Sequence, residues 1–184
     1  MILNRCIEDK FFYFQDFLPK KEYKRIHDDV LKERKKLLFR NVSETWDKNL
    51  YNNLTEPMKV TMKPDYFANL ANILGNLPHV HLNAKEMSFC IHYMKKNSGI
   101  NWHADAGHDY AITYYLNHNW NQQWGGEFMY KHEGEFGFIP IIGNSVVIIK
   151  SPMMHKVNTV LSPIMPRLSI QSFISPDKKD RFKR

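Results

Sequence analysis

The chain has 184 residues, 43% of them apolar and 14% aromatic, which is enough for one substantial core and predicts a single domain over residues 1–184. Much of its formal net charge of +7 lies in residues 20–36 and in the tail 178–184, which we interpret as solvated charge because charge runs usually solvate rather than bind. Two distant cysteines exclude a disulfide framework, and no apolar run approaches the roughly 20 residues of a membrane span, so we expect a protein of the reducing cytoplasm.

The first half of the chain carries two helical patterns. In residues 19–39, apolar side chains recur at three-, four- and seven-residue steps between charged ones, which predicts an amphipathic helix. A similar stripe directly after Pro64 predicts a helix over residues 65–77. Residues 41–63 show no clear period and are expected to form strand, loop or lid. We therefore interpret residues 1–80, approximately, as helical support for the second half of the chain.

From residue 86 onward the apolar period changes to two. Met87, Phe89, Ile91 and Tyr93 share one face of a predicted strand and alternate with Ser88, Cys90, His92 and Met94 on the other. Further strand-like runs cover residues 110–116, 126–131, 145–150 and 168–174. Helices followed by short strands predict a mainly β fold, an antiparallel sandwich or jelly roll of about residues 86–175, buttressed by N-terminal helices.

Three side chains in this β region form a candidate metal site. His103 and Asp105 follow strand-patterned sequence, and on an extended backbone residues two apart project from the same face. His155 comes from a separate stretch. A second His-x-Asp, at His27, lies in helical sequence, where residues two apart point in opposed directions and cannot close on one ion. Two histidines and one carboxylate leave the other side of an Fe(II) ion open, as oxygen activation requires.

Each of these residues also has a simpler interpretation. Asp105 could cap a turn, and His155 could be an ordinary core or surface histidine. Arg167 opens the last predicted strand. Inside a barrel it would need an anion such as a dicarboxylic co-substrate, because the free-energy cost of an unpaired buried charge is prohibitive. At an exposed strand end it would need no ionic partner.

Together these residues resemble the Fe(II)- and 2-oxoglutarate-dependent dioxygenases, most closely their prolyl hydroxylase branch. The resemblance covers about residues 86–175. Besides the two histidines, the aspartate and the arginine, it includes the runs Tyr114-Tyr115-Leu116-Asn117 and Trp124-Gly125-Gly126-Glu127. It implies a double-stranded β-helix (jelly-roll, cupin-like) core, Fe(II) as the metal, and 2-oxoglutarate and O2 as co-substrates, with ascorbate as a candidate reductant.

The resemblance also implies which residues contact 2-oxoglutarate. These are Arg167, Tyr115, and Tyr93, which precedes His103 by ten residues. Both tyrosines are also what a half-buried strand would use for packing. The twelve residues from His155 to Arg167 are a few more than is usual in prolyl hydroxylases, which we interpret as a longer turn between two strands.

The implied reaction is hydroxylation of an unactivated C–H bond, with release of succinate and CO2. Peptidyl proline is the favoured substrate, and a free amino acid or small metabolite is its main rival. A nucleic-acid substrate is disfavoured, because the repair dioxygenases carry a second arginine six positions after the first, where this chain has Phe173. An alternative of another class is a catalytically silent β-sandwich that binds a metal or ligand.

Overall fold

The computed structural model describes residues 1–33, 39–62, 64–105 and 107–174 and is mainly β. Its large antiparallel sheet has the strand order β1-β2-β10-β7-β12-β5-β4-β3. These strands are β1 (Ile2–Ile7), β2 (Phe11–Gln15), β3 (Arg40–Asn41), β4 (Met58–Met62), β5 (Met87–Met94), β7 (Tyr110–Tyr115), β10 (Val146–Lys150) and β12 (Arg167–Ile174).

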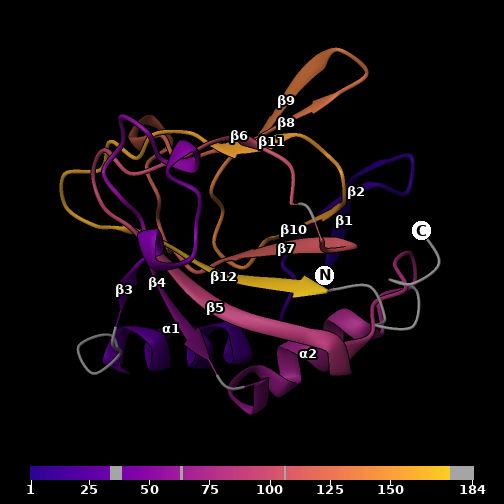
Figure 1. Ribbon diagram of the computed structural model, residues 1–184. Helices are drawn as coiled ribbons and strands as arrows, with labels where there is room; N and C mark the ends of the chain where they lie inside the picture. The colour runs from indigo at the N-terminus through magenta and orange to yellow at the C-terminus, as the bar shows by residue number, and fades with distance from the viewer. Residues whose placement is uncertain (34–38, 63, 106, 175–184) are drawn as a thin grey trace.

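A smaller antiparallel sheet faces the large one, in the order β6-β11-β8-β9. Its strands are β6 (Ile100–His103), β8 (Phe128–His132), β9 (Glu135–Ile139) and β11 (His155–Val157). Two α-helices, α1 (Lys20–Glu33) and α2 (Ala68–Gly75), lie on the opposite side of the large sheet from the small one (Figure 1). The two facing sheets are the expected double-stranded β-helix, and the helices buttress it from outside.

The helices are held by an apolar stripe against the outer face of the large sheet. In α1, Tyr23, Ile26 and Val30 are almost fully buried, as the predicted spacing requires, and burying each aliphatic side chain stabilises the fold by roughly 1.5–3 kcal/mol. The Tyr23 hydroxyl donates to the Leu116 carbonyl oxygen at 3.1 Å. Beyond α1, the predicted helix up to residue 39 runs into residues 34–38, which lie outside the described part of the chain.

The second predicted helix is shorter and begins differently. A 3-10 turn, η3 (Pro64–Phe67), precedes α2, which ends at Gly75. The other 3-10 turns are η1 (Val42–Glu44), η2 (Lys48–Leu50), η4 (Ala84–Glu86) and η5 (Gln122–Trp124). No helix within the described ranges is long and apolar enough to cross a membrane.

The interpretation of residues 1–80 as helical support needs a correction. Residues 1–15 form the hairpin β1–β2, and β3 and β4 extend the opposite end of the large sheet. The aromatic run Phe11–Phe14 in β2 is buried on both faces, by the helices on one side and the small sheet on the other. A strand buried on both faces shows no alternation, and for this reason the sequence did not predict it.

Candidate metal centre

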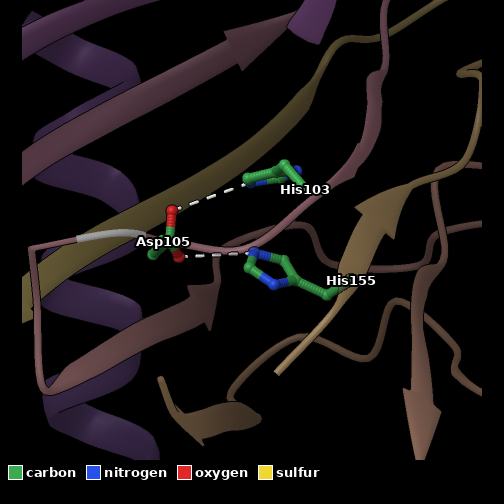
Figure 2. A group of neighbouring side chains, drawn as sticks. All are labelled: His103, Asp105 and His155. Atoms are coloured by element: carbon green, nitrogen blue, oxygen red, sulfur yellow. Dashed lines mark ion pairs between the residues drawn. The ribbon is translucent and has the colours of Figure 1, made fainter. Parts of the chain in front are cut away.

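The three predicted metal ligands converge between the two sheets. His103 ends β6 and lies directly opposite His155, the first residue of β11, in the antiparallel register of these strands. Asp105 follows β6 and faces both rings (Figure 2). Its carboxylate oxygens lie 3.7 Å from Nε2 of His103 and 3.3 Å from Nε2 of His155. All three ligand atoms lie within 4.8 Å of one another, so one ion could contact them all.

Hydrogen bonds to the backbone fix how both imidazoles are presented. Nδ1 of His103 lies 2.7 Å from the Asn101 carbonyl oxygen, and Nδ1 of His155 lies 2.9 Å from that of Met153. A carbonyl oxygen only accepts, so each Nδ1 carries the hydrogen and each Nε2 keeps the lone pair that a metal requires. The Phe128 ring stacks on His155 at 5.3 Å and holds its plane.

The electrostatics of the cluster suit a cation. Burial lowers the pKa of His103, and the adjacent His155 lowers it further, so this ring stays neutral. Burial alone would raise the pKa of Asp105, but its interaction with the neighbouring histidines, His155 above all, lowers the pKa below its usual value. An ionised Asp105 carboxylate is a suitable ligand for a divalent cation.

A second group with metal-binding side chains is much less suited to hold an ion. Glu8, His132 and Glu133 meet at the tips of the β1–β2 and β8–β9 hairpins. Both glutamates are exposed, and Nζ of Lys10 already lies 2.9 Å from the Glu8 carboxylate. The lysine supplies the positive charge that an ion would otherwise supply.

Arg167 lies at the start of β12 and is fully buried inside the barrel. Its Nε donates to the Gly126 carbonyl oxygen at 3.0 Å, and Nη1 donates to Oγ of Ser169 at 3.0 Å. Its Nη2 has no hydrogen-bond partner, and no carboxylate pairs with the guanidinium, among the residues that the structure describes. Glu127 acts on this charge only from beyond ion-pair distance. A buried arginine with a free Nη2 donor and no directly paired carboxylate among the described residues is suited to bind an anion.

Tyr115 lies beside this arginine. Its ring centroid is 5.2 Å from Cζ of Arg167, and within the described ranges its hydroxyl has no hydrogen-bond partner. Burial raises its pKa to about 12, against the opposing effect of the Arg167 charge, so the hydroxyl is a donor at neutral pH. Gly126 (φ +78°) makes room, since a Cβ there would lie 3.2 Å from Cδ of Arg167.

The Tyr93 side chain does not point into the barrel interior, where Arg167 and Tyr115 lie. Its side chain lies on the helix-facing side of the large sheet, where its ring packs 5.2 Å from that of Phe39. The residue of β5 that faces the interior is its neighbour His92, which is 3% exposed and has no partner on either ring nitrogen among the described residues. Burial, aided by the positive charges of Arg167 and Lys59, lowers the pKa of His92 to about 3.

A cavity of about 480 Å³ lies between the two sheets, beside the metal site. The inner faces of both sheets line it, including the three metal-site residues and His92. Trp46 and Leu50, from the stretch that showed no sequence period, close one wall. Nδ2 of Asn101 donates to the Asn49 carbonyl oxygen at 2.8 Å and fastens this wall to β6. The stretch 41–62 thus contains strand, 3-10 turn and loop, and part of it borders the site.

Residues 89–175 match the model of the 2OG-Fe(II) oxygenase superfamily. This segment is similar to the superfamily, and it contains all three metal-site residues together with Tyr115 and Arg167. The similarity supports an oxidoreductase. Comparison with curated proteins gives no match to this chain.

Solved structures share the fold of this chain at low sequence identity. A prolyl hydroxylase from Trichoplax adhaerens, in complex with a hypoxia inducible factor peptide fragment, is 18% identical with a TM-score of 0.76, over 96% of this chain and 87% of its own. A Pseudomonas putida prolyl-4-hydroxylase is 12% identical with a TM-score of 0.73, over 91% and 93%. HygX from Streptomyces hygroscopicus, with nickel, 2-oxoglutarate and hygromycin B bound, is 10% identical with a TM-score of 0.64, over 92% and 84%.

Proposed function

We propose that this chain, as one domain, is an Fe(II)- and 2-oxoglutarate-dependent dioxygenase that hydroxylates a prolyl residue in a peptide or protein. The observation that carries the proposal is the His103–Asp105–His155 cluster, with two Nε2 atoms and one carboxylate aimed at a common point. Two nitrogens and one carboxylate on one side of the ion are the donor set of oxygen-activating iron sites. When bound, Fe(II) and 2-oxoglutarate supply the oxygen activation and oxidative decarboxylation that yield succinate and CO2.

The chain's part in this reaction is to hold, orient and shield. The two imidazoles and Asp105 would hold the metal, and all three residues line the cavity. Arg167 and Tyr115 offer the far carboxylate of 2-oxoglutarate a free Nη2 and a free hydroxyl, as a charge-assisted pair and a neutral hydrogen bond. His92 replaces Tyr93 as the contact from β5, because its ring faces the cavity and its nitrogens are free to bond.

The prolyl assignment draws on the local sequence and the fold. The Tyr-Tyr-Leu-Asn and Trp-Gly-Gly-Glu runs resemble the prolyl hydroxylases, and the chain shares its fold with two prolyl hydroxylases at TM-scores of 0.76 and 0.73. A small-molecule substrate is the second candidate. The enclosing wall around Trp46 favours it, since that wall narrows the approach to the cavity.

A substrate screen tests the proposal. The protein is incubated with Fe(II), 2-oxoglutarate, ascorbate and air, with either a library of proline-containing peptides or a library of amino acids and metabolites. We expect one peptide to gain one oxygen on proline, together with stoichiometric succinate, and expect His155→Ala to give neither. An oxygen gained only by free metabolites would favour the second candidate, and succinate from neither library would favour a catalytically silent domain.

A further inference from the structure

The outward face of the small sheet carries an unusual set of side chains. Along β8, β9 and β11, the inward positions hold metal-site and core residues, and the outward positions alternate with them. The register of β6 is irregular, and its Trp102 lies on the outward face because its ring contacts that of Phe136. We call the outward set the outer platform: Trp102, Met129, Lys131, Phe136, Phe138 and Lys156. Every member is aromatic, methionine or lysine, and none carries a negative charge.

Its aromatic rings form one exposed apolar surface. Phe136 and Phe138, on β9, are 64% and 62% exposed, and Trp102, on β6, is 37% exposed. Although β6 and β9 are the two edges of this sheet, the Trp102 and Phe136 rings meet with centroids 5.6 Å apart. The apolar surface therefore spans the sheet from edge to edge, as an interaction site does and scattered surface residues do not.

Positive charge lies directly over these rings. Nζ of Lys131 is 5.5 Å from the Phe136 ring centroid, and Nζ of Lys156 is 5.9 Å from that of Trp102. The nearest acidic residue of β9, Glu135, alternates with Phe136 and shares the other face of the strand with Gly137. The outer platform is thus both apolar and cationic.

The backbone beside the platform is open as well. β9 pairs with β8 on one side, and on its other side no strand of the described ranges pairs with it. The β8–β9 hairpin projects away from the rest of the sheet (Figure 1). Gly137 packs closely on the Tyr130 ring, which keeps the strand in place. An exposed, ordered edge strand can accept one more strand by backbone hydrogen bonding.

We propose that the outer platform and the edge of β9 bind an extended acidic segment of a partner polypeptide. The segment adds to β9 as a further strand, and its apolar side chains cover Phe136 and Phe138. Its carboxylates reach Lys131, whose ammonium already lies above β9, and Lys156. This docking does not depend on the proposed hydroxylation, because the platform faces away from the metal site.

Two other occupants fit the platform less well. A second copy of this chain would place Lys131 and Lys156 of both copies against each other, in a protein of net charge +7. Single-stranded nucleic acid favours rings arranged for successive stacking and a track of cations along the backbone. Here the Trp102 and Phe136 planes are inclined at 57°, and the platform has two lysines and no arginine.

The test uses the full chain and fluorescently labelled, capped eight-residue peptides. One peptide is built of valine and glutamate, and a second has lysine in place of glutamate. Binding is followed by fluorescence anisotropy, first at low and then at high salt. The variants are Phe136→Ser with Phe138→Ser, and Lys131→Glu with Lys156→Glu. Matched controls are Ile164→Ser, which removes an apolar side chain 72% exposed elsewhere, and Lys85→Glu.

We expect the acidic peptide to bind saturably and the lysine peptide to bind at least about tenfold more weakly. Each double variant should bind the acidic peptide with at least about tenfold lower affinity, and both control variants should bind it as the wild type does. Salt should weaken binding of the acidic peptide. Equal affinity for both peptides, or no saturation at millimolar peptide, would overturn the proposal. Two other results would also overturn it, if the acidic peptide does not bind. One is binding of labelled oligothymidylate that the phenylalanine double variant abolishes. The other is dimerisation, seen by sedimentation equilibrium, that the same variant abolishes.

Discussion

The side chain of Asn117 bonds to the backbone on both sides of Arg167. Nδ2 donates to the Pro166 carbonyl oxygen at 2.9 Å, and Oδ1 accepts from the Leu168 amide at 2.7 Å. This asparagine ends the Tyr-Tyr-Leu-Asn run, lies two residues after the end of β7 and is 5% exposed. The motif therefore fixes the start of β12 and, with it, the direction in which the buried guanidinium points.

Replacing Asn117 should mainly weaken co-substrate binding. In Asn117→Ala the Pro166 oxygen and the buried Leu168 amide lose their partner, which costs roughly 1–3 kcal/mol of unfolding free energy. The loosened Arg167 should raise KM for 2-oxoglutarate several-fold with a smaller change in kcat and unchanged Mn(II) affinity. Asn117→Asp, which keeps the acceptor for Leu168, should fall between wild type and alanine. A fall in kcat alone would show that Asn117 does not act through Arg167.

Arg167→Met should remove the response to 2-oxoglutarate and spare the response to metal. At 2-oxoglutarate about one hundred times its dissociation constant, the metal-loaded wild type should gain about 2.7 kcal/mol of stability. The variant should gain almost none, because methionine offers the carboxylate neither charge nor donor. Thermal unfolding with Mn(II), with and without 2-oxoglutarate, measures both responses. Lys95→Met is the control for loss of a cation, and equal loss of both responses would make Arg167 purely structural.

The neighbours His92 and Tyr93 form a matched pair, because they lie on opposite faces of β5. His92→Leu should weaken 2-oxoglutarate binding by about tenfold through loss of one hydrogen bond in the cavity. Tyr93→Phe should leave it unchanged, since the Tyr93 side chain packs against Phe39 outside the barrel. Isothermal titration with Mn(II)-loaded protein compares the two. The reverse order of effects would restore Tyr93 as the contact from this strand.

Acid should destabilise the fold through His92. Its pKa is lowered to about 3 in the folded protein and is near 6.5 when unfolded. The unfolded chain thus binds a proton that the folded chain does not, and stability falls as pH falls below about 6.5, by about 1.4 kcal/mol per pH unit until about pH 3. Urea unfolding across this range should show a shallower fall for His92→Leu. Parallel curves for wild type and variant would show that His92 does not titrate in this way.

The sequence predicted the strands of the β core well, because they are short runs rich in apolar and β-branched residues and are bounded by turn residues. β5, β7, β10 and β12 lie within one or two residues of the predicted runs. β9 was not predicted, since Phe136 and Phe138 point into solvent and reverse the usual pattern. The interval before Arg167 is indeed a connection between two strands, β11 and β12.

The metal-site residues were predicted from spacing, but the orientation of β5 was not. The alternation of Tyr93 with His92 was visible, yet both faces of this strand are covered, so the sequence did not reveal which one is interior. Counting ten residues back from His103 crosses the turn at residues 95–99, and one residue more or less in such a turn exchanges the two faces. The convergence of His155 with His103 likewise depends on strand pairing over fifty residues, which no local pattern records.

The most direct test of the account is the anaerobic addition of Fe(II) and 2-oxoglutarate to the purified protein, followed by visible absorption spectroscopy. The account predicts a metal-to-ligand charge-transfer band that needs both additions in wild type, is lost in His103→Ala and His155→Ala, and survives in the platform variant Phe136→Ser. A wild-type protein that folds, as judged by circular dichroism, and yet shows no such band at any concentration of Fe(II) and 2-oxoglutarate would contradict it.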